Sequence, residues 1–319
     1  MNNGGINRVA FLDEVHPYLK EQLSKRGIAC DDLTGKSSNT IFDIIDKYQG
    51  IVIRSRFPVN KQFLDKAIGL KFIARSGAGM ENIDIEYARL KGIALFNSPE
   101  GNRTAVAEHT IGMLLSLFNQ LNRADMEVRD GIWDREGNRG MELEGKTLAI
   151  IGYGNMGSAL AKRLQCFGVK VLAYDKYKKG YGNNRVLETD WERIYKEADI
   201  VSLHVPLAED TLYLMDKTRF NSFKKPVFLI NTARGKNVKT VDLLAAIGQG
   251  KVLGACLDVL EFESTSFENM EGNGKIYKAL LKSDKVILSP HVAGWTKESY
   301  YKLSWFLYQK IADIYFDNN

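Results

Sequence analysis

The sequence contains few cysteines and no long hydrophobic run. Its 319 residues include three cysteines, Cys30, Cys166 and Cys256, which form no CxxC pair. An odd, scattered set argues against a disulfide framework and a zinc site, so we expect no metal and a reducing, cytoplasmic location. Cys166 and Cys256 lie in apolar stretches and are expected to be small core residues. Because no stretch approaches the roughly 20 apolar residues of a transmembrane helix, we expect no membrane association.

A strong charge of one sign is also missing. The net charge is +5, and lysine and arginine are spread along the chain without a dense basic block. This modest surplus suits small anionic substrates and cofactors, and we expect no nucleic-acid partner. The length suggests about two domains. A hydrophobic content of 45% is enough for full cores.

Short apolar runs recur along the whole chain, with amphipathic segments such as residues 41–48 between them. This alternation predicts an α/β fold with parallel sheets. The runs are continuously apolar rather than alternating, which is typical of strands covered on both faces of a sheet. The predicted strands are residues 9–12, 51–53, 72–74, 93–96, 148–151, 169–174, 200–203, 227–230, 253–257 and 286–288.

The most informative motif is a glycine-rich hexapeptide that follows the apolar run 147–151. A helical segment and a second apolar run come after it. In such a turn the first glycine permits a tight bend, the second lets the backbone approach a pyrophosphate, and the third lets helix and strand pack closely. The helix N-terminus adds unpaired N–H groups and the positive end of its dipole. We therefore expect a dinucleotide to bind at Gly152, Tyr153, Gly154, Asn155, Met156 and Gly157.

Asp175 ends the second apolar run and completes this pattern. An acid at that place accepts hydrogen bonds from the adenosine ribose hydroxyls. Its carboxylate would repel a 2′-phosphate, which predicts NAD rather than NADP as the cofactor. Lys176 and Lys178 follow closely, and their positive charges would soften that preference.

The position of the glycine motif also predicts the order of the domains. The motif belongs to the first strand of a Rossmann unit, yet a long α/β stretch precedes it. We therefore expect two Rossmann-like doubly wound domains, with the NAD-binding domain (residues 102–289) inserted into the substrate domain (1–101 plus 290–319). Residues 103–130 contain few helix breakers and are predicted to form one long helix that bridges the two.

Three isolated polar side chains follow apolar runs: Arg234, Glu263 and His291. In doubly wound sheets, ligands bind outside the carboxyl ends of the strands. Taken singly, each is an ordinary surface, loop or turn residue. Together with the glycine motif, they indicate an active site.

Eight segments resemble motifs of the D-isomer-specific 2-hydroxyacid dehydrogenase family, and they occur in the family's order. The resemblance implies that His291 is the acid/base, Glu263 its partner, and Arg234 the group that binds the substrate carboxylate. These residue types suit the chemistry, because histidine transfers protons near neutral pH, a carboxylate orients it, and arginine grips a carboxylate with two hydrogen bonds. The segments are residues 76–84, 97–102, 106–108, 152–157, 204–207, 231–235, 257–263 and 289–294.

The resemblance also implies further ligand-binding residues, which do not include the two remaining histidines. His16 and His109 are expected to be structural or exposed. The chain departs from the family after Glu263, where Ser264 replaces a frequent proline and a longer loop, residues 264–275, follows. The implied cofactor-binding residues are His204, Val205, Pro206, Thr211, Thr232, Ala233 and Asp258, the last near the nicotinamide. The implied substrate-binding residues are Ser76, Gly77, Ala78, Gly79 and Asn102.

The choice of substrate depends on three arginines, Arg54, Arg56 and Arg75, which lie at predicted strand ends. Such a cluster is able to hold a phosphate. The Arg54-Ser55-Arg56 pattern resembles D-3-phosphoglycerate dehydrogenases, which oxidise 3-phosphoglycerate in serine biosynthesis. Alternatives are a glyoxylate/hydroxypyruvate reductase, another D-2-hydroxyacid dehydrogenase, or an NAD-sensing binding protein similar to the transcriptional corepressors of this fold.

The predicted long helix is apolar on more than one face, and such a helix must be buried. We therefore expect a homodimer joined largely through the helix that begins near Arg103. The sequence ends soon after a last predicted helix at residues 296–317, so we also expect a short form without an appended serine-binding regulatory domain.

Overall fold

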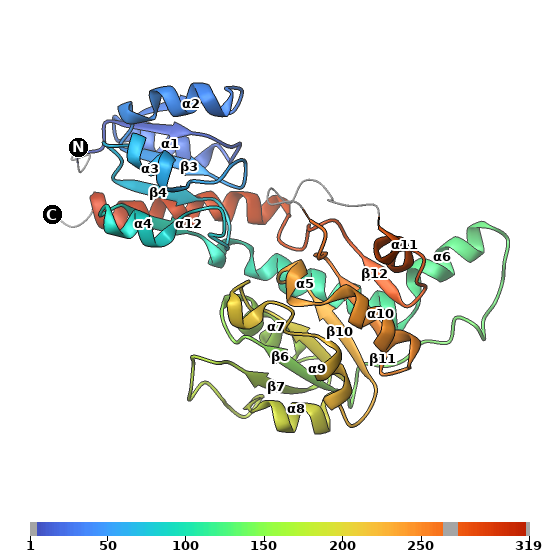
Figure 1. Cartoon of the computed structure of the whole chain (residues 1–319). Helices are drawn as coiled ribbons and strands as arrows, with labels where there is room; N and C mark the ends of the chain where they lie inside the picture. The colour runs from blue at the N-terminus through green and yellow to red at the C-terminus, as the bar shows by residue number, and fades with distance from the viewer. Residues whose placement is uncertain (1–4, 264–273, 317–319) are drawn as a thin grey trace. The chain divides into compact units, whose positions relative to one another are not determined.

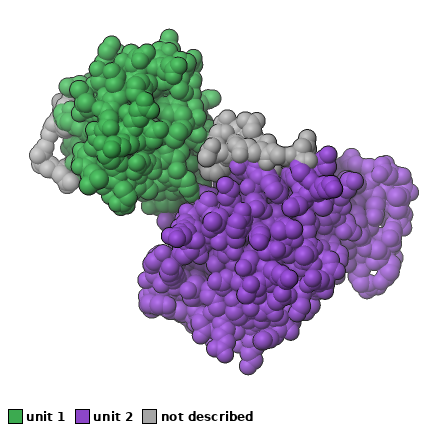
Figure 2. All heavy atoms as spheres, in the orientation of Figure 1, with its two compact units in different colours: residues 1–102, 265–268, 295–319 green, residues 103–264, 269–294 purple. Residues whose placement is uncertain are grey.

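The computed structural model describes residues 5–263 and 274–316 of the chain. These residues form two compact units, which Figure 2 colours separately. Unit 1 contains residues 5–102 and 295–316, and unit 2 contains residues 103–263 and 274–294. In the described ranges, no helix is both long and apolar enough to cross a membrane.

Unit 1 is built on a five-stranded parallel sheet in the order β2-β1-β3-β4-β5. Alternate residues of each strand point to opposite faces, and helices cover both faces. The strands are β1 (Arg8–Phe11), β2 (Ala29–Asp32), β3 (Gly50–Ile53), β4 (Phe72–Arg75) and β5 (Ala94–Asn97). The helices are α1 (Tyr18–Lys25), α2 (Ser38–Ile44), η1 (Ile45–Lys47), α3 (Lys61–Lys66), α4 (Ile85–Leu90) and α12 (Lys297–Tyr315).

The two faces of this sheet carry separate cores. Ala10, Ile51 and Ile73 belong to a cluster that includes residues of α2 and α3. Their chain neighbours Val9 and Phe72 belong to a cluster that includes residues of α1 and α12. The predicted burial of both faces is therefore present in unit 1.

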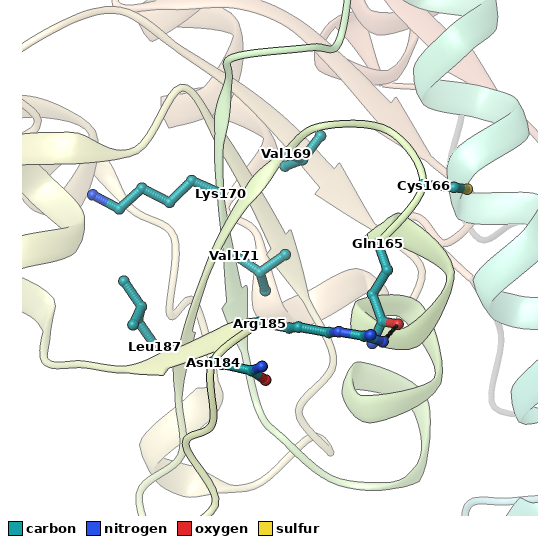
Figure 3. Close-up of a pocket in the computed structure, with 8 residues that line it drawn as sticks. All are labelled: Gln165, Cys166, Val169, Lys170, Val171, Asn184, Arg185 and Leu187. Carbon is teal, nitrogen blue, oxygen red and sulfur yellow. Dashed lines mark hydrogen bonds between the residues drawn. The ribbon is translucent and has the colours of Figure 1, made fainter.

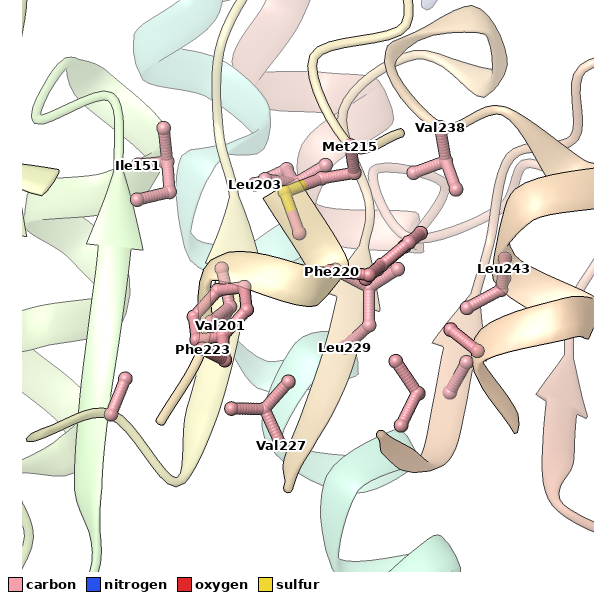
Figure 4. Packing of buried hydrophobic residues seen from close by; sticks show 14 of the residues in the cluster. Ile151, Val201, Leu203, Met215, Phe220, Phe223, Val227, Leu229, Val238 and Leu243 are labelled. Atoms are coloured by element: carbon pink, nitrogen blue, oxygen red, sulfur yellow. The ribbon is translucent and has the colours of Figure 1, made fainter. Parts of the chain in front are cut away.

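Unit 2 is built on a seven-stranded parallel sheet in the order β12-β11-β10-β9-β6-β7-β8 (Figure 1). Figure 4 shows how side chains of β6, β9 and β10 pack with Met215, Phe220 and Leu243 on one face. The strands are β6 (Thr147–Ile151), β7 (Lys170–Tyr174), β8 (Val186–Glu188), β9 (Ile200–Leu203), β10 (Val227–Asn231), β11 (Val252–Leu257) and β12 (Val286–Leu288). The helices are α5 (Pro99–Phe118, which begins in unit 1), α6 (Leu121–Arg129), α7 (Asn155–Leu164), α8 (Trp191–Glu197), η2 (Glu209–Thr211), α9 (Lys217–Ser222), η3 (Gly235–Asn237), α10 (Thr240–Gly248) and α11 (Lys275–Leu281).

The strand order of unit 2 reverses at β6. The chain runs from β6 outward through β7 to β8, then returns to β9 on the other side of β6. Residues that follow β6 and β9 are therefore neighbours at the carboxyl edge of the sheet, and this is where doubly wound sheets bind ligands. Gly152 and His204 occupy those two places.

The predicted α/β fold with parallel sheets is confirmed, and each predicted apolar run forms a strand. Two strands were not predicted, β2 and β8. β2 has the polar sequence Ala-Cys-Asp-Asp, and β8 has three residues. Both lie at sheet edges, where a strand has one neighbour and needs little apolar surface, so hydrophobic patterning does not reveal them.

The prediction of one helix over residues 103–130 is wrong. Helix α5 begins earlier, at Pro99, and ends at Phe118, while Gln120 has a left-handed backbone with φ of 51° before α6 begins. The carbonyl of Phe118 accepts a hydrogen bond from the N–H of Met141, and the Gln120 side chain donates to the carbonyls of Gly137 and Arg139. Hydrogen bonds with residues 137–141 therefore end the helix, although no proline or glycine marks this position in the sequence.

Two smaller predictions also differ from the structure. Cys166 is exposed, because it follows the last turn of α7, and its thiol donates to the carbonyl of Arg163. Cys256 is buried as expected. Unit 2 extends to Gly294, beyond the predicted boundary at residue 289. The reason is that the segment after β12 is hydrogen-bonded to Asp258 of unit 2.

Candidate active site

The turn after β6 has the geometry that a dinucleotide requires. Gly152 has a φ of +95°, and a Cβ there would lie 2.5 Å from the carbonyl oxygen of His204. A Cβ on Gly157 would lie 2.1 Å from the carbonyl oxygen of Gly152, so glycine is needed for α7 to pack on β6. A Cβ on Gly154 would meet no protein atom within 4 Å, which leaves open space where a pyrophosphate would approach the N-terminus of α7. The residues present therefore fit the cofactor.

Asp175 lies beside this turn, directly after β7. One carboxylate oxygen accepts the N–H of Tyr153 at 2.8 Å, and the other accepts the N–H groups of Tyr177 and Lys178 at 2.9 Å each. Burial raises the pKa of Asp175, but these three backbone hydrogen bonds outweigh burial and hold its pKa below the ordinary value. The carboxylate is thus charged at neutral pH. A carboxylate has about four acceptor positions, so one remains for a ribose hydroxyl.

The two lysines after Asp175 have partners of their own. The Nζ of Lys176 lies 2.6 Å from the carboxylate of Asp210. The Nζ of Lys178 donates to the carbonyl of Tyr153 at 3.3 Å. The charge of Lys176 is therefore paired with a carboxylate, whereas Lys178 stays beside the turn, where its positive charge helps to lower the pKa of Asp175.

His204 supports the glycine turn from the end of β9. Its N–H donates to the carbonyl of Ile151, and its Nε2 lies 2.8 Å from the hydroxyl of Ser202. The Nδ1 atom is buried and has no hydrogen-bond partner among the described residues, although the residue as a whole is partly exposed. Burial lowers the pKa of His204 to about 4. A histidine that stays neutral at physiological pH holds the turn and moves no proton.

The other predicted cofactor residues lie along the same edge of the sheet. The Thr211 hydroxyl donates to the carbonyl of Pro206 at 2.6 Å and closes the loop after β9, which also contains Val205. After β10, the Thr232 hydroxyl lies 3.2 Å from that of Thr110 in α5. The N–H of Ala233 donates to the side chain of Asn231. The sheet therefore brings the predicted residues of β6, β9 and β10 to one edge.

Glu263 and His291 form a direct pair. The Nδ1 of His291 lies 2.8 Å from a carboxylate oxygen of Glu263, and the other oxygen accepts the N–H of Leu260. The side chains are only 25% and 11% exposed, so solvent screens the pair weakly. When Nδ1 donates to the carboxylate, Nε2 becomes the atom that exchanges a proton with a substrate.

Arg234 lies in a tightly braced loop after β10. Its N–H donates to the side chain of Asn237, and its carbonyl accepts from the side chain of Asn231. Both asparagines are fully buried. A Cβ on the next residue, Gly235, would lie 1.9 Å from the carbonyl oxygen of Leu260. This close approach packs the Arg234 loop against the loop that leads to Glu263.

Asp258 holds the segment that carries His291. Its side chain is 1% exposed, and its oxygens accept the hydroxyl of Ser289 at 2.6 Å and the N–H groups of Val292 and Ala293 at 2.9 Å each. Its carbonyl accepts the N–H of His291, which has an uncommon φ of 54°. This carboxylate positions the loop that carries His291, and its predicted place near the nicotinamide stays a prediction.

Two residues of this network were not predicted as functional. The Nε2 of His109, in α5, lies 2.9 Å from the Ser289 hydroxyl and 3.6 Å from the nearer oxygen of Asp258. Ser289 stands in a segment that resembles the family and His109 directly follows one, yet neither role is visible from spacing. The contact joins α5 to the end of β12, residues far apart in the sequence.

In unit 1 the predicted substrate loop follows β4. The N–H of Ser76 donates to the carbonyl of Ile53, so it is not offered to a ligand, while Gly77, Ala78 and Gly79 stay candidates. Gly77 has a φ of +154°, and a Cβ there would collide with the guanidinium of Arg75. The Oδ1 atom of Asn102 is buried without a hydrogen-bond partner among the described residues, which makes it a candidate for a ligand contact.

The three arginines have different surroundings. The Arg56 guanidinium donates to the carbonyls of Leu12, Leu33 and Lys36, so it joins three chain segments, and its role as a phosphate ligand stays a prediction. Arg75 donates to the carbonyl of Arg54 at 3.2 Å, so its side chain lies against the backbone of Arg54.

The backbone before these side chains is fixed by Asp13. One oxygen of its carboxylate accepts the N–H groups of three successive residues, Arg54, Ser55 and Arg56. The backbone N–H groups of the loop after β3 are therefore bound to the carboxylate of Asp13.

Residues 111–293 match the family described as D-isomer specific 2-hydroxyacid dehydrogenase, NAD binding domain. A D-3-phosphoglycerate dehydrogenase from Archaeoglobus fulgidus is 34% identical over 309 residues, which are 96% of this chain and 57% of that protein. The chain belongs to the D-isomer specific 2-hydroxyacid dehydrogenase family. It is thereby a member of a family of NAD-dependent oxidoreductases, and unit 2 carries the family's NAD-binding domain.

Other members of the family differ in substrate and length. A hydroxypyruvate reductase from Thermotoga maritima is 35% identical over 271 residues, 85% of this chain and 86% of that protein. The structure of an Aquifex aeolicus D-lactate dehydrogenase complexed with NAD and lactic acid superposes with a TM-score of 0.82 at 28% identity, covering 97% of this chain and 95% of that one. The chain spans about half the length of most D-3-phosphoglycerate dehydrogenases that it matches.

One pocket of unit 2 lies apart from the predicted family site. It has a volume of about 500 Å³ and is formed at the sheet edge near β7 and β8, where the Arg185 guanidinium bonds to the side chain of Gln165 (Figure 3). The lining also includes Cys166 and Leu187 but no residue of the predicted site. The predicted long loop 264–275 lies largely outside the described residues.

Proposed function

We propose that the protein oxidises a D-2-hydroxy acid to the 2-keto acid with NAD, and that its substrate is 3-phosphoglycerate. The observation that carries the proposal is the 2.8 Å contact between His291 and Glu263, in the domain that contains the cofactor turn. A histidine paired with a carboxylate is suited to take the hydroxyl proton and to remain charged afterwards. In this proposal Nε2 of His291 receives that proton.

The remaining residues of the chain position the substrate. NAD, when bound at the Gly152–Gly157 turn, supplies the hydride acceptor. The Arg234 guanidinium binds the substrate carboxylate, and the bracing of its loop by buried asparagines supports a fixed direction for that grip. The Asp258 hydrogen bonds hold the His291 segment, so the imidazole is oriented before a substrate arrives.

The phosphate part of the proposal rests on Arg54 and Arg75. The side chain of Arg75 donates to the main-chain carbonyl of Arg54, and the two residues lie at the ends of the neighbouring strands β3 and β4. A dianionic phosphate is the group that best suits two adjacent guanidinium groups. The similarity to D-3-phosphoglycerate dehydrogenases supports this choice, whereas the Thermotoga maritima relative supports hydroxypyruvate reduction as the second candidate.

Absorbance at 340 nm with NAD and a panel of acids tests the proposal. We expect 3-phosphoglycerate to have a kcat/KM well above that of D-glycerate, which lacks only the phosphate. Arg54→Ala or Arg75→Ala should raise KM for the phosphorylated acid by about 10- to 150-fold, the value of a hydrogen bond to a charged group. The matched control is Arg56→Ala, which should lower thermal stability and leave the ratio of the two KM values unchanged. If the wild-type kcat/KM is the same for 3-phosphoglycerate and D-glycerate, the proposed substrate is wrong and hydroxypyruvate reduction becomes the assignment.

We also propose a homodimer, now with a different interface. The apolar side of α5 packs inside unit 2, where Ile111, Met113, Leu114 and Phe118 are core residues, so its burial needs no partner. Helix α6 has no buried residue, and it lies at the periphery of unit 2 (Figure 1). Exposed apolar surface of this kind is typical of an interface, and the partner we infer is a second copy. The exposed side chains are Leu121, Met126, Val128, Ile132, Trp133 and Met141.

The location of the protein is a further proposal. All three cysteines are unpaired in the structure. Free thiols suit a reducing compartment, which supports the cytoplasm.

A further inference from the structure

An exposed tryptophan in unit 1 stands against one of the proposed phosphate ligands. Trp295 precedes α12 and is 52% exposed, which is unusual for so large an apolar side chain. The guanidinium carbon of Arg54 lies 4.1 Å from the centroid of its ring system. This distance is within the range of a cation–π contact, which is strongest with tryptophan.

The surroundings of Arg54 favour this one arrangement of its side chain. Its backbone N–H is fixed by Asp13 at 2.6 Å, and its carbonyl accepts from Arg75. The ring of Tyr300 lies 6.2 Å from that of Trp295 and continues the aromatic surface. Within the described part of unit 1, no side chain or carbonyl accepts a hydrogen bond from the Arg54 guanidinium, in contrast to Arg56.

A stacked guanidinium still has its hydrogen-bond donors available. Stacking occupies a face of the planar group, whereas all five N–H bonds point outward in its plane. An unrestrained arginine would lose much of its side-chain freedom on binding an anion, and a ring that already holds the plane removes part of that cost. The tryptophan thus has a function in binding even though it makes no polar contact itself.

We propose that Trp295 is a positioning residue that determines specificity, because it holds the Arg54 guanidinium ready for a second anionic group of the substrate. The inference rests on the proposed function, which gives Arg54 a phosphate monoester to bind. The substrate favoured by this pair carries a dianionic group in addition to its 2-hydroxy acid. A substrate without that group gains nothing from the tryptophan.

The test compares Trp295→Leu with Trp295→Phe, which keeps an aromatic face, on 3-phosphoglycerate and D-glycerate. A cation–π contact contributes between about 0.5 and 2 kcal/mol, so Trp295→Leu should raise KM for 3-phosphoglycerate by roughly 2- to 30-fold with little change in kcat. Trp295→Phe should restore most of the affinity. Equal increases of KM for both acids, or a loss confined to kcat, would overturn the inference.

A double-mutant cycle with Arg54→Ala separates this inference from the proposed function. If the two side chains act together, Trp295→Leu has no further effect on KM once Arg54 is alanine; if it has its full effect there, the inference is wrong. Failure of the proposed substrate appears in the wild-type enzyme, before any substitution. The cycle is then measured with the best accepted acid that carries a second anionic group, where coupling supports the positioning role and additivity refutes it. Thermal melting of each variant identifies a folding defect, and Trp295→Phe replaces Trp295→Leu in the cycle if the latter is unfolded.

Discussion

Protonation of His204 should destabilise unit 2 in mild acid. The Nδ1 atom of its imidazole is buried without a hydrogen-bond partner among the described residues, and burial lowers the pKa of His204 to about 4 from an ordinary value of 6.5. Between pH 4 and pH 6.5, His204 is protonated in the unfolded chain but not in the folded chain, so the free energy of unfolding rises with pH. The contribution is lost as pH falls from 6.5 towards 4 and is fully present above 6.5.

The size of the effect follows from the two pKa values. Each pH unit between them costs about 1.4 kcal/mol, so the full loss approaches about 3 kcal/mol. About two thirds of that loss should be present at pH 5. This is a large part of the total stability of a typical domain.

The variant that isolates the effect is His204→Gln. Its amide offers a partner to the Ser202 hydroxyl but does not titrate. Urea unfolding followed by circular dichroism at pH 7.5 and pH 5 should show a smaller acid loss for the variant, by about 2 kcal/mol. The matched control is His16→Gln in unit 1, which should keep the wild-type dependence on pH. If His204→Gln also loses stability with acid as steeply as the wild type, the buried imidazole is not the cause.

Four further predictions concern catalysis, cofactor choice and assembly. His291→Ala should lower kcat by about 10²- to 10⁴-fold while the Kd for NADH, measured by fluorescence, stays nearly constant; wild-type turnover would remove His291 from its role. Glu263→Gln should lower kcat by about 10- to 150-fold, because the protonated imidazole loses a charged hydrogen-bond partner at 2.8 Å, and an unchanged kcat would count against the pair. Asp175→Ala should reduce the ratio of kcat/KM with NAD to kcat/KM with NADP. In the wild type this ratio should stay constant from pH 8 to pH 5, because the lowered pKa of Asp175 keeps its carboxylate charged there. A wild-type ratio that falls to near one by pH 5 would contradict this. Trp133→Glu should convert a dimer into a monomer by light scattering, and a monomeric wild type would refute the proposed interface.

The sequence predicts most of the parallel sheets because buried strands need continuous apolar runs. It also predicts the glycine turn, since close approaches of the backbone require glycine at Gly152 and Gly157, and Gly154 borders open space. The end of α5 at Phe118 could not be read in the same way. It depends on hydrogen bonds to residues 137–141, and no local signal announces such contacts.

Side-chain roles were harder to predict than side-chain positions. Arg54 and Arg56 look alike in the sequence, yet the guanidinium of Arg54 lies over Trp295, whereas that of Arg56 donates to the carbonyls of Leu12, Leu33 and Lys36, which follow β1 and β2. Asp258 was identified by resemblance, but its hold on the backbone N–H groups of Val292 and Ala293, more than thirty positions later, was not predicted. Such roles depend on which chain segments meet, and composition and spacing do not contain that information.

The carboxylate of Asp13 has a consequence for how substrate choice can change in this protein. It already occupies the three backbone N–H groups of residues 54–56. The main-chain N–H groups there are already used, so in the proposed substrate site recognition falls to the side chains that this backbone presents. Exchanging those side chains alters which acid is accepted without rebuilding the loop. The loop after β3 thus combines a backbone held by Asp13 with exchangeable side chains, and directed evolution for new acid substrates has its natural starting point there.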